Sequence, residues 1–91
     1  MKLPRIENMQ SRNGNIVPNQ YKVFAEEGTY FQSYSTIVAF KPFRGKVQLD
    51  REKWDYSRTT GKYRNLFLRE SKKETEQKIR SGEYELVDLN E

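Results

Sequence analysis

The run TYFQSYSTIVAFK, residues 29–41, does most to limit what this chain can fold into. Aromatic and β-branched residues dominate this run, and such residues suit the pleated, half-buried surface of a sheet better than a helix. Pro42 ends the run, because proline cannot donate a backbone hydrogen bond to a neighbouring strand. We therefore expect one long or bent strand over residues 29–41 and a fold built around a sheet.

Two shorter runs beside it also have the character of strands. Residues 21–25, YKVFA, precede a turn at residues 26–28, and residues 46–50, KVQLD, alternate apolar and polar side chains. Residues 43–45 are expected to form a hairpin connection into this last run. Three antiparallel strands follow from these patterns.

The apolar period changes after residue 50. Tyr63, Leu66 and Phe67 have the spacing of one helix face, and Ser57 stands where an N-cap would begin a helix that runs to residue 69. Gly61 counts against this helix, so a hairpin about Thr60 and Gly61 is the alternative.

The C-terminal part predicts a second helix and a last strand. Ser71 and Glu74 have the spacing of a capping box, so a polar helix should run to Arg80 and end at Gly82. Residues 84–89, YELVDL, suit a strand. The expected fold class is α+β: a small antiparallel sheet of three to four strands covered by two short helices, in the order β-β-β-α-α-β. Residues 1–18 are expected to be a flexible arm with a turn at Asn13 and Gly14, and residues 19–91 a single domain.

Composition argues against catalysis. The 91 residues contain no cysteine and no histidine, so disulfides, thiolate chemistry and the usual acid/base group near neutral pH are all missing. We expect no enzyme and no cofactor; an enzyme using Asp50, Asp55 and Tyr63 is the weaker alternative. Asp50, Glu52 and Asp55 alternate with bases and have no calcium-loop glycine, so no metal site is expected either.

Charge is unevenly distributed along the chain. Residues 41–80 carry thirteen Lys or Arg against six Asp or Glu, whereas residues 81–91 carry four acids and no base. A basic segment of this kind suits an anionic partner, although the two ends could also neutralise each other.

The first candidate surface is the basic, hydroxyl-rich start of the predicted helix. A helix N-terminus offers free N–H groups, and hydroxyls beside Arg and Lys add donors for phosphate oxygens. The residues expected to bind nucleic acid are Ser57, Arg58, Thr59, Thr60, Lys62 and Arg64, aided by Lys41, Arg44 and Lys46. The alternative is structural: Ser57 caps the helix, the Thr residues fill its first turn and the bases form a solvated face.

The second candidate surface is aromatic. On a strand, Tyr30, Gln32 and Tyr34 share one face, which could stack bases or bind a protein partner. The alternative is that these rings cover the small core. Trp54 is expected either to fix a loop against the sheet or to act as a partner hot spot.

Several segments resemble a known group of proteins. SRNGN (residues 11–15), YFQSY (residues 30–34), WDYSRTT (residues 54–60) and KYRN (residues 62–65) are similar to small, functionally uncharacterised proteins of tailed phages and prophages of Gram-positive bacteria. The resemblance covers residues 11–90. Residues 1–10 and the basic loop at residues 40–46 are where this chain departs from the group.

The resemblance implies a binding role. We expect a non-enzymatic phage-type accessory protein that binds nucleic acid or a nucleoprotein complex through a basic, aromatic-flanked surface. The alternative is a protein-binding inhibitor or adaptor of a host enzyme or defence complex. The expected partners are DNA or RNA, or a host nucleic-acid-processing protein, in the cytoplasm of a host bacterial cell. No membrane association is expected, and an exposed edge at residues 84–89 offers a route to a homodimer.

Overall fold

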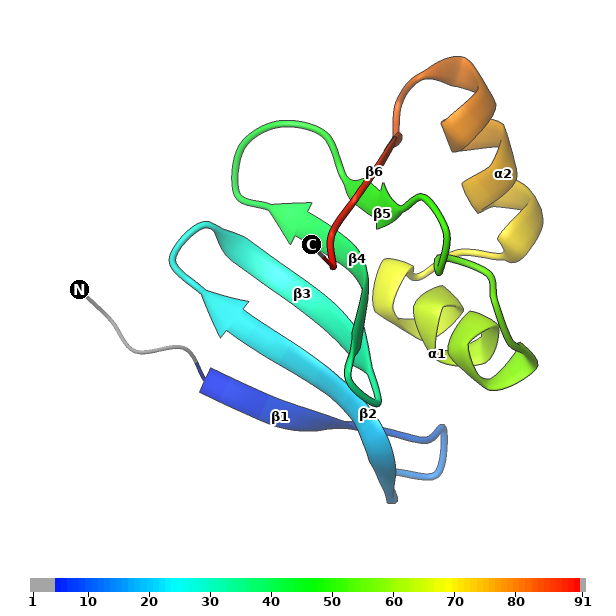
Figure 1. Cartoon of the computed structure of the whole chain (residues 1–91). Helices are drawn as coiled ribbons and strands as arrows, with labels where there is room; N and C mark the ends of the chain where they lie inside the picture. Colours follow the sequence, from blue (N-terminus) through cyan, green and yellow to red (C-terminus); the bar gives the residue numbers. More distant parts are fainter. Residues whose placement is uncertain (1–4, 91) are drawn as a thin grey trace.

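A computed structural model describes residues 5–90 of the protein and shows one sheet with two helices (Figure 1). The sheet has six strands in sequence order: β1 (Arg5–Gln10), β2 (Ile16–Ala25), β3 (Gly28–Ser33), β4 (Thr36–Pro42), β5 (Gln48–Asp50) and β6 (Glu85–Val87). Neighbours are antiparallel from β1 to β5, whereas β6 lies parallel to β5. The helices α1 (Arg58–Leu68) and α2 (Lys72–Ser81) form the crossover that a parallel pair requires.

The prediction of the sheet was therefore wrong in the number of strands and in their directions. The sequence predicts three to four antiparallel strands in the order β-β-β-α-α-β, and the structure has a six-stranded mixed sheet in the order β-β-β-β-β-α-α-β. The last strand makes the sheet mixed, because it pairs with β5 in the parallel direction. The two additional strands come from the central run and from the N-terminal segment.

The central run is a hairpin and not one strand. It divides into β3 and β4 at a turn of two residues, Tyr34 and Ser35. Tyr34 has a φ of 57°, and its N–H donates to the carbonyl of Asn19 at 2.6 Å. Such turns usually carry glycine or asparagine, so a tyrosine in the left-handed region gives no turn signal in the sequence.

The N-terminal segment also supplies strands. Residues 5–10, expected in a flexible arm, form β1, and residues 16–18 begin β2; residues 1–4 lie outside the described residues. The predicted turn is present between the two strands, where the N–H of Gly14 donates to the carbonyl of Ser11 at 2.9 Å. The strand β1 escaped prediction because only Met9 of its six residues is buried.

Both helices begin at the predicted caps. Ser57 accepts from the N–H of Thr60, which places a helix where the alternative was a hairpin, and Ser71 forms a complete capping box with Glu74. Neither helix in the described part of the chain is long and apolar enough to span a membrane.

The core lies between α1 and one face of the sheet. Phe67 of α1 stacks on Phe31 of β3 at 5.6 Å between ring centroids. The buried hydrophobic cluster comprises Met9, Phe31, Val38, Ala39, Leu49, Tyr63, Phe67 and Tyr84. Because successive side chains of a strand point to opposite faces, Tyr30 and its neighbour across the hairpin, Phe40, lie on the face away from α1.

Gly28 sits where β3 begins, close to the end of β4. Its φ is 154°, and a Cβ at this position would overlap the carbonyl oxygen of Lys41 and the Cα of Pro42. The close approach of the two backbones therefore requires a residue without a side chain.

Candidate nucleic-acid interface

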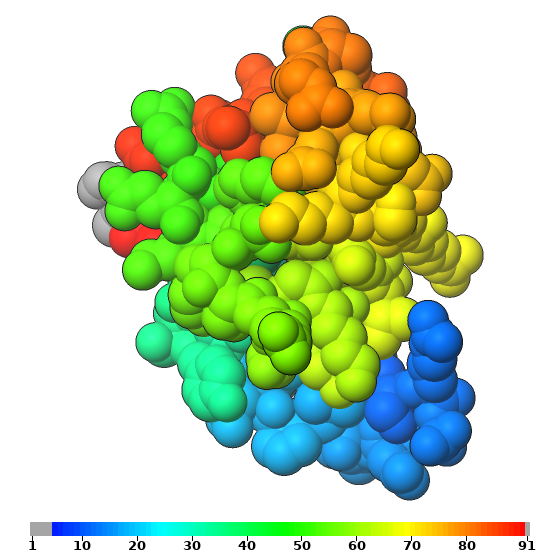
Figure 2. Space-filling view, turned by 90° about the vertical axis from the view of Figure 1, so that its right-hand side faces the viewer, coloured from blue at the N-terminus to red at the C-terminus, as the bar shows by residue number. Residues whose placement is uncertain are grey.

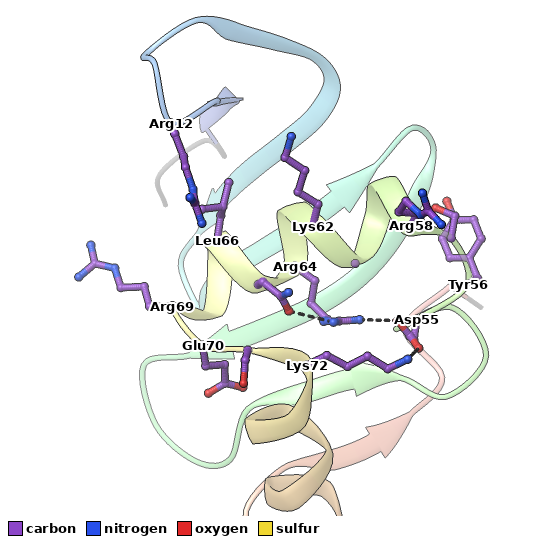
Figure 3. Close-up of a pocket in the computed structure, with 14 residues that line it drawn as sticks. Arg12, Asp55, Tyr56, Arg58, Lys62, Arg64, Leu66, Arg69, Glu70 and Lys72 are labelled. Atoms are coloured by element: carbon purple, nitrogen blue, oxygen red, sulfur yellow. Dashed lines mark hydrogen bonds and ion pairs between the residues drawn. The ribbon is translucent and has the colours of Figure 1, made fainter.

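A groove of about 1170 Å³ runs along the outward side of α1 (Figure 3). One wall is the turn between β1 and β2, and the other is formed by residues 55–57 with the link into α2. Figure 2 shows α1 lying between this turn and α2. We call this groove the basic groove. Its lining residues are Arg12, Asp55, Tyr56, Ser57, Arg58, Gly61, Lys62, Arg64, Asn65, Leu66, Arg69, Glu70, Ser71 and Lys72.

Positive charge predominates in the basic groove, where six Arg or Lys side chains face two carboxylates. Four of the cations are exposed and have no ion-pair partner among residues 5–90: Arg12, Arg58, Lys62 and Arg69. Arg58 and Lys62 lie one turn apart on α1, whereas Arg69 follows its last turn in a left-handed conformation that ends the helix. These four side chains can approach an anion without first breaking an ion pair.

The carboxylate of Asp55 is already paired. Its two oxygens contact Arg64 Nη1 at 2.9 Å and Lys72 Nζ at 2.7 Å. Burial alone would raise the pKa of Asp55, but the hydrogen bonds from Lys72 and Arg64 hold the pKa below its ordinary value. Asp55 is therefore ionised and neutralised within the protein.

Glu70, the second carboxylate of the groove, is paired too. Its oxygens accept from Lys78 Nζ at 2.7 Å, from the hydroxyl of Thr75 at 2.6 Å and from the hydroxyl of Tyr84 at 2.9 Å. The side chain is only 4% exposed. Burial opposes ionisation, yet these hydrogen bonds keep the pKa of Glu70 below its ordinary value. Neither carboxylate offsets the four exposed cations.

Arg64 was expected to bind phosphate, and the structure gives it a different place. The side chain is 1% exposed and forms part of the groove floor. Nη1 donates to the carbonyl of Trp54 at 2.8 Å and to Asp55 at 2.9 Å, and Nη2 donates to the Asn65 side chain at 2.9 Å. Its charge is used to hold the segment before α1 onto the helix.

The hydroxyls of the helix start also have structural roles. Ser57 lines the groove, but its Oγ accepts the N–H of Thr60 at 3.1 Å as an N-cap. The side chain of Thr60 is 1% exposed and shares a hydrogen bond with Ser33 at 3.0 Å under the helix. Thr59 is exposed and lies outside the groove lining. The structural alternative is thus confirmed for Ser57 and Thr60.

The three auxiliary bases do not line the groove. Lys41 donates from Nζ to the carbonyl of Phe67 at 2.9 Å and lies 4.4 Å from the centre of its ring. Partial burial, and then the charges of Lys22 and Arg69, lower the pKa of Lys41. Arg44 and Lys46 are exposed in the loop between β4 and β5, on the side of the sheet distant from α1 (Figure 1).

The expected partner-binding residues form a separate surface. Tyr30 stacks on Phe40 with ring centroids 4.3 Å apart, on the sheet face away from α1, and its hydroxyl donates to Glu27 at 2.7 Å. Gln32 donates to the carbonyl of Tyr34, whose side chain is 58% exposed at the hairpin turn. These residues do not adjoin the groove.

Trp54 is separated from that surface. It packs against the hydrophobic core, and the guanidinium of Arg64 lies 5.1 Å from the centre of its ring. This packing is what the predicted role of fixing a segment against the sheet requires, and the role as a partner hot spot stays a prediction.

Reasoning from the sequence missed ten of the fourteen lining residues as members of a binding surface, among them the three bases Arg12, Arg69 and Lys72 and the aromatic Tyr56. Arg12 lay in the expected arm, and Arg69 and Lys72 flank a short link between helices. The only signal for the two bases near the link was the charge excess of residues 41–80, which does not say which side of the fold a base occupies.

The three carboxylates considered as a metal cluster do not come together. No group of three or more acidic, His or Cys side chains within residues 5–90 has the arrangement of a metal site. Asp50 instead accepts the N–H of Lys53 at 2.9 Å and of Leu89 at 2.8 Å, whereas Asp55 pairs with Arg64 and Lys72.

The fold and the groove together define a small mixed-sheet α+β protein with a cationic surface over its first helix. The chain belongs to a family of unknown function, DUF8033, whose family model matches residues 4–83. The whole lining of the basic groove lies within the matched residues. No curated protein and no solved structure matches the chain.

Proposed function

We propose that this protein is a non-enzymatic accessory protein that binds nucleic acid, alone or within a nucleoprotein complex, through the basic groove. The observation that carries the proposal is the set of four exposed cations without an ion pair in residues 5–90, gathered round a hollow whose two carboxylates are already paired. Phosphate contacts by Lys and Arg supply most of the sequence-independent affinity for a nucleic acid.

The arrangement of the cations suits a chain of phosphates better than one anion. Arg58 and Lys62 project from α1 itself, and Arg12 and Arg69 stand at the other end of the groove (Figure 3). Arginine can bind a phosphate through two parallel hydrogen bonds, so Arg12, Arg58 and Arg69 would fix position as well as add charge.

A titration at two salt concentrations tests the proposal. Labelled single- and double-stranded oligonucleotides are titrated at about 50 and 200 mM salt, because each phosphate contact adds roughly 0.7 to 0.9 to the slope of log K against log salt. The double variant Arg58→Ala/Lys62→Ala should weaken binding for all sequences alike and reduce the slope by about 1.4 to 1.8.

The matched control is Arg44→Ala/Lys46→Ala, which removes the same charge from the loop between β4 and β5. This variant should bind nearly as the unaltered protein does. Equal weakening by both double variants would assign the effect to net charge and would reject the groove as the interface. A salt-independent titration, or no binding at the lower salt, would reject nucleic-acid binding itself.

The biological setting belongs to the same proposal. The resemblance to phage proteins supports a place in the cytoplasm of a host bacterial cell, where DNA, RNA or a host nucleic-acid-processing protein would be the partner. The strand β6 lies at the edge of the sheet that residues 5–90 form, and this position supports a homodimer as a further arrangement. Sedimentation equilibrium would test the dimer.

A second candidate function is binding to a host enzyme or defence complex as an inhibitor or adaptor. The sheet face away from α1 favours it, because it carries the Tyr30 and Phe40 stack, and the exposed Tyr34 stands at the turn that follows β3. The variant Tyr30→Ala/Tyr34→Ala should then lose protein partners from nuclease-treated host lysate. Absence of every partner after nuclease treatment of the unaltered protein would reject this function.

A further inference from the structure

Tyr56 is a lining residue of the basic groove that the proposed phosphate contacts leave unused. The side chain is 43% exposed and stands beside Arg58 at one end of the groove, opposite the end with Arg12 and Arg69 (Figure 3). Lys53 Nζ lies 5.2 Å from the centre of its ring. An exposed ring next to cations is the combination that proteins use to stack a base while they hold its phosphates.

The shape of the groove bears on which nucleic acid it accepts. A protein that reads a duplex directly inserts a protruding helix into the major groove, which is about 12 Å wide. Here exposed side chains of α1 line a hollow together with Arg12 of the β1–β2 turn and Tyr56 before the helix. The bases of a duplex are already stacked on one another, whereas a single strand can lie along the hollow with its bases free to stack on an exposed ring.

The length of the groove fits more than one nucleotide. Arg69 lies eleven positions after Arg58 in the chain, which corresponds to about 16 Å along a helix axis. The cations at the two ends can therefore contact phosphates of different nucleotides in one strand, with the aromatic ring placed beside the first of them.

We infer that the basic groove takes a single strand of DNA or RNA, with one base stacked on Tyr56 and the neighbouring phosphates on Arg58 and Lys62. This inference rests on the proposed function and adds the class of nucleic acid and a second kind of contact. Stacking on a ring is tolerant of sequence, because every base presents a flat π-face.

Three probes of equal length test the inference: a labelled single-stranded 12-mer, the same sugar-phosphate oligomer without bases, and the duplex. The 12-mer should bind more tightly than both others. Tyr56→Ala should weaken the 12-mer about 5- to 150-fold, the range that stacking of about 1 to 3 kcal/mol gives. Tyr56→Ala should leave the affinity for the abasic oligomer unchanged. Tyr56→Phe should bind the 12-mer with the affinity of the unaltered protein.

The outcomes separate the inference from the proposed function. If the abasic oligomer binds as well as the 12-mer, or the duplex binds as tightly, the groove is a phosphate site and the single-strand inference fails. An unchanged affinity of Tyr56→Ala for the 12-mer also overturns it. Absence of binding to all three probes rejects the proposed function itself. Thermal unfolding of each variant shows whether the fold is intact.

Discussion

At the scale of single residues, the same residue type does two different jobs on α1. Arg58 is exposed, whereas Arg64, on the same helix, is 1% exposed and bonded to Trp54, Asp55 and Asn65. The difference arises because residues 54–55 fold back over the helix at Arg64 and leave Arg58 in water. A charge count along the sequence weighs both residues equally.

This contrast leads to a stability prediction. Arg64→Ala should lower the free energy of unfolding by about 3 to 5 kcal/mol, because it leaves buried groups without their charged partner. Arg58→Ala should change it by less than about 0.5 kcal/mol, as exposed substitutions usually do. Urea unfolding of the two variants measures both changes. If Arg64→Ala lowers the free energy of unfolding no more than Arg58→Ala does, Arg64 is not a structural residue.

At the scale of elements, α2 is held by a polar anchor more than by apolar packing. Thr75 is its only buried residue, and it bonds to Glu70, which also accepts from Lys78 on α2 and from Tyr84 before β6. One carboxylate thus joins the link between the helices, the second helix and the approach to the last strand. Burial, and then the hydrogen bond to Glu70, raise the pKa of Tyr84 to about 12.

Removal of this anchor should loosen α2 before the rest of the fold. Glu70→Ala should lower the free energy of unfolding by about 3 to 5 kcal/mol, since Lys78 and two hydroxyls lose their acceptor. Amide hydrogen exchange should speed up first in α2 and β6, while β2 and β3 stay protected. The matched control is Glu83→Ala, an exposed carboxylate near the same strand. Uniform acceleration across all elements would contradict the role of Glu70 as a local anchor.

How far each element could be predicted depended on whether its ends carry a chemical signature. Both helices were predicted because a serine that can cap a helix, Ser57 or Ser71, stands directly before each of them. The hairpin between β3 and β4 was missed because Tyr34 occupies its left-handed position. The strand β1 was missed because it lies at the sheet edge and buries one residue, so its sequence does not alternate in polarity.

At the scale of the whole molecule, three carboxylates are hydrogen-bonded in the folded state and tie distant segments together. Asp50 joins the end of β5 to Leu89, Asp55 joins the start of α1 to α2, and Glu70 joins α2 to the approach to β6. In each case burial would raise the pKa, and the hydrogen bonds outweigh it and lower the pKa.

The fold should therefore be sensitive to acid. A carboxyl whose pKa is lower in the folded than in the unfolded chain adds stability above its unfolded pKa, here 3.8 for the two Asp and 4.5 for Glu70. That contribution is lost as pH falls through the lowered values, because the unfolded chain then binds more protons. In urea unfolding, the contribution of these carboxyls to the free energy of unfolding should be constant above about pH 5. The free energy of unfolding should decline steeply below about pH 4.

A variant assigns part of this decline. Asp50→Asn should lower the free energy of unfolding at pH 7 by about 2 to 3 kcal/mol, because the backbone N–H groups of Lys53 and Leu89 lose a charged acceptor. The decline below about pH 4 should be shallower in this variant, since one titrating group is gone. A stability that rises on acidification of the unaltered protein would contradict the assignment.

The candidate site was harder to predict than the elements for a reason that belongs to this scale. The groove joins Arg12, from a turn near the N-terminus, to residues 55–72, and only the folded sheet brings them together. Sequence reasoning found Arg58 and Lys62, which lie within one helix. It assigned Arg64 to the surface because the spacing of charges says nothing about which segment will cover them.

The close approach at Gly28 has a consequence for the history of this fold. Any side chain there would strike the backbone at Lys41 and Pro42, and no rotamer can relieve a clash with main-chain atoms. A substitution at this position can therefore be tolerated during evolution only if the ends of β3 and β4 separate at the same time. Relatives that keep this hairpin should carry glycine at the position, and sequencing of such relatives would check this.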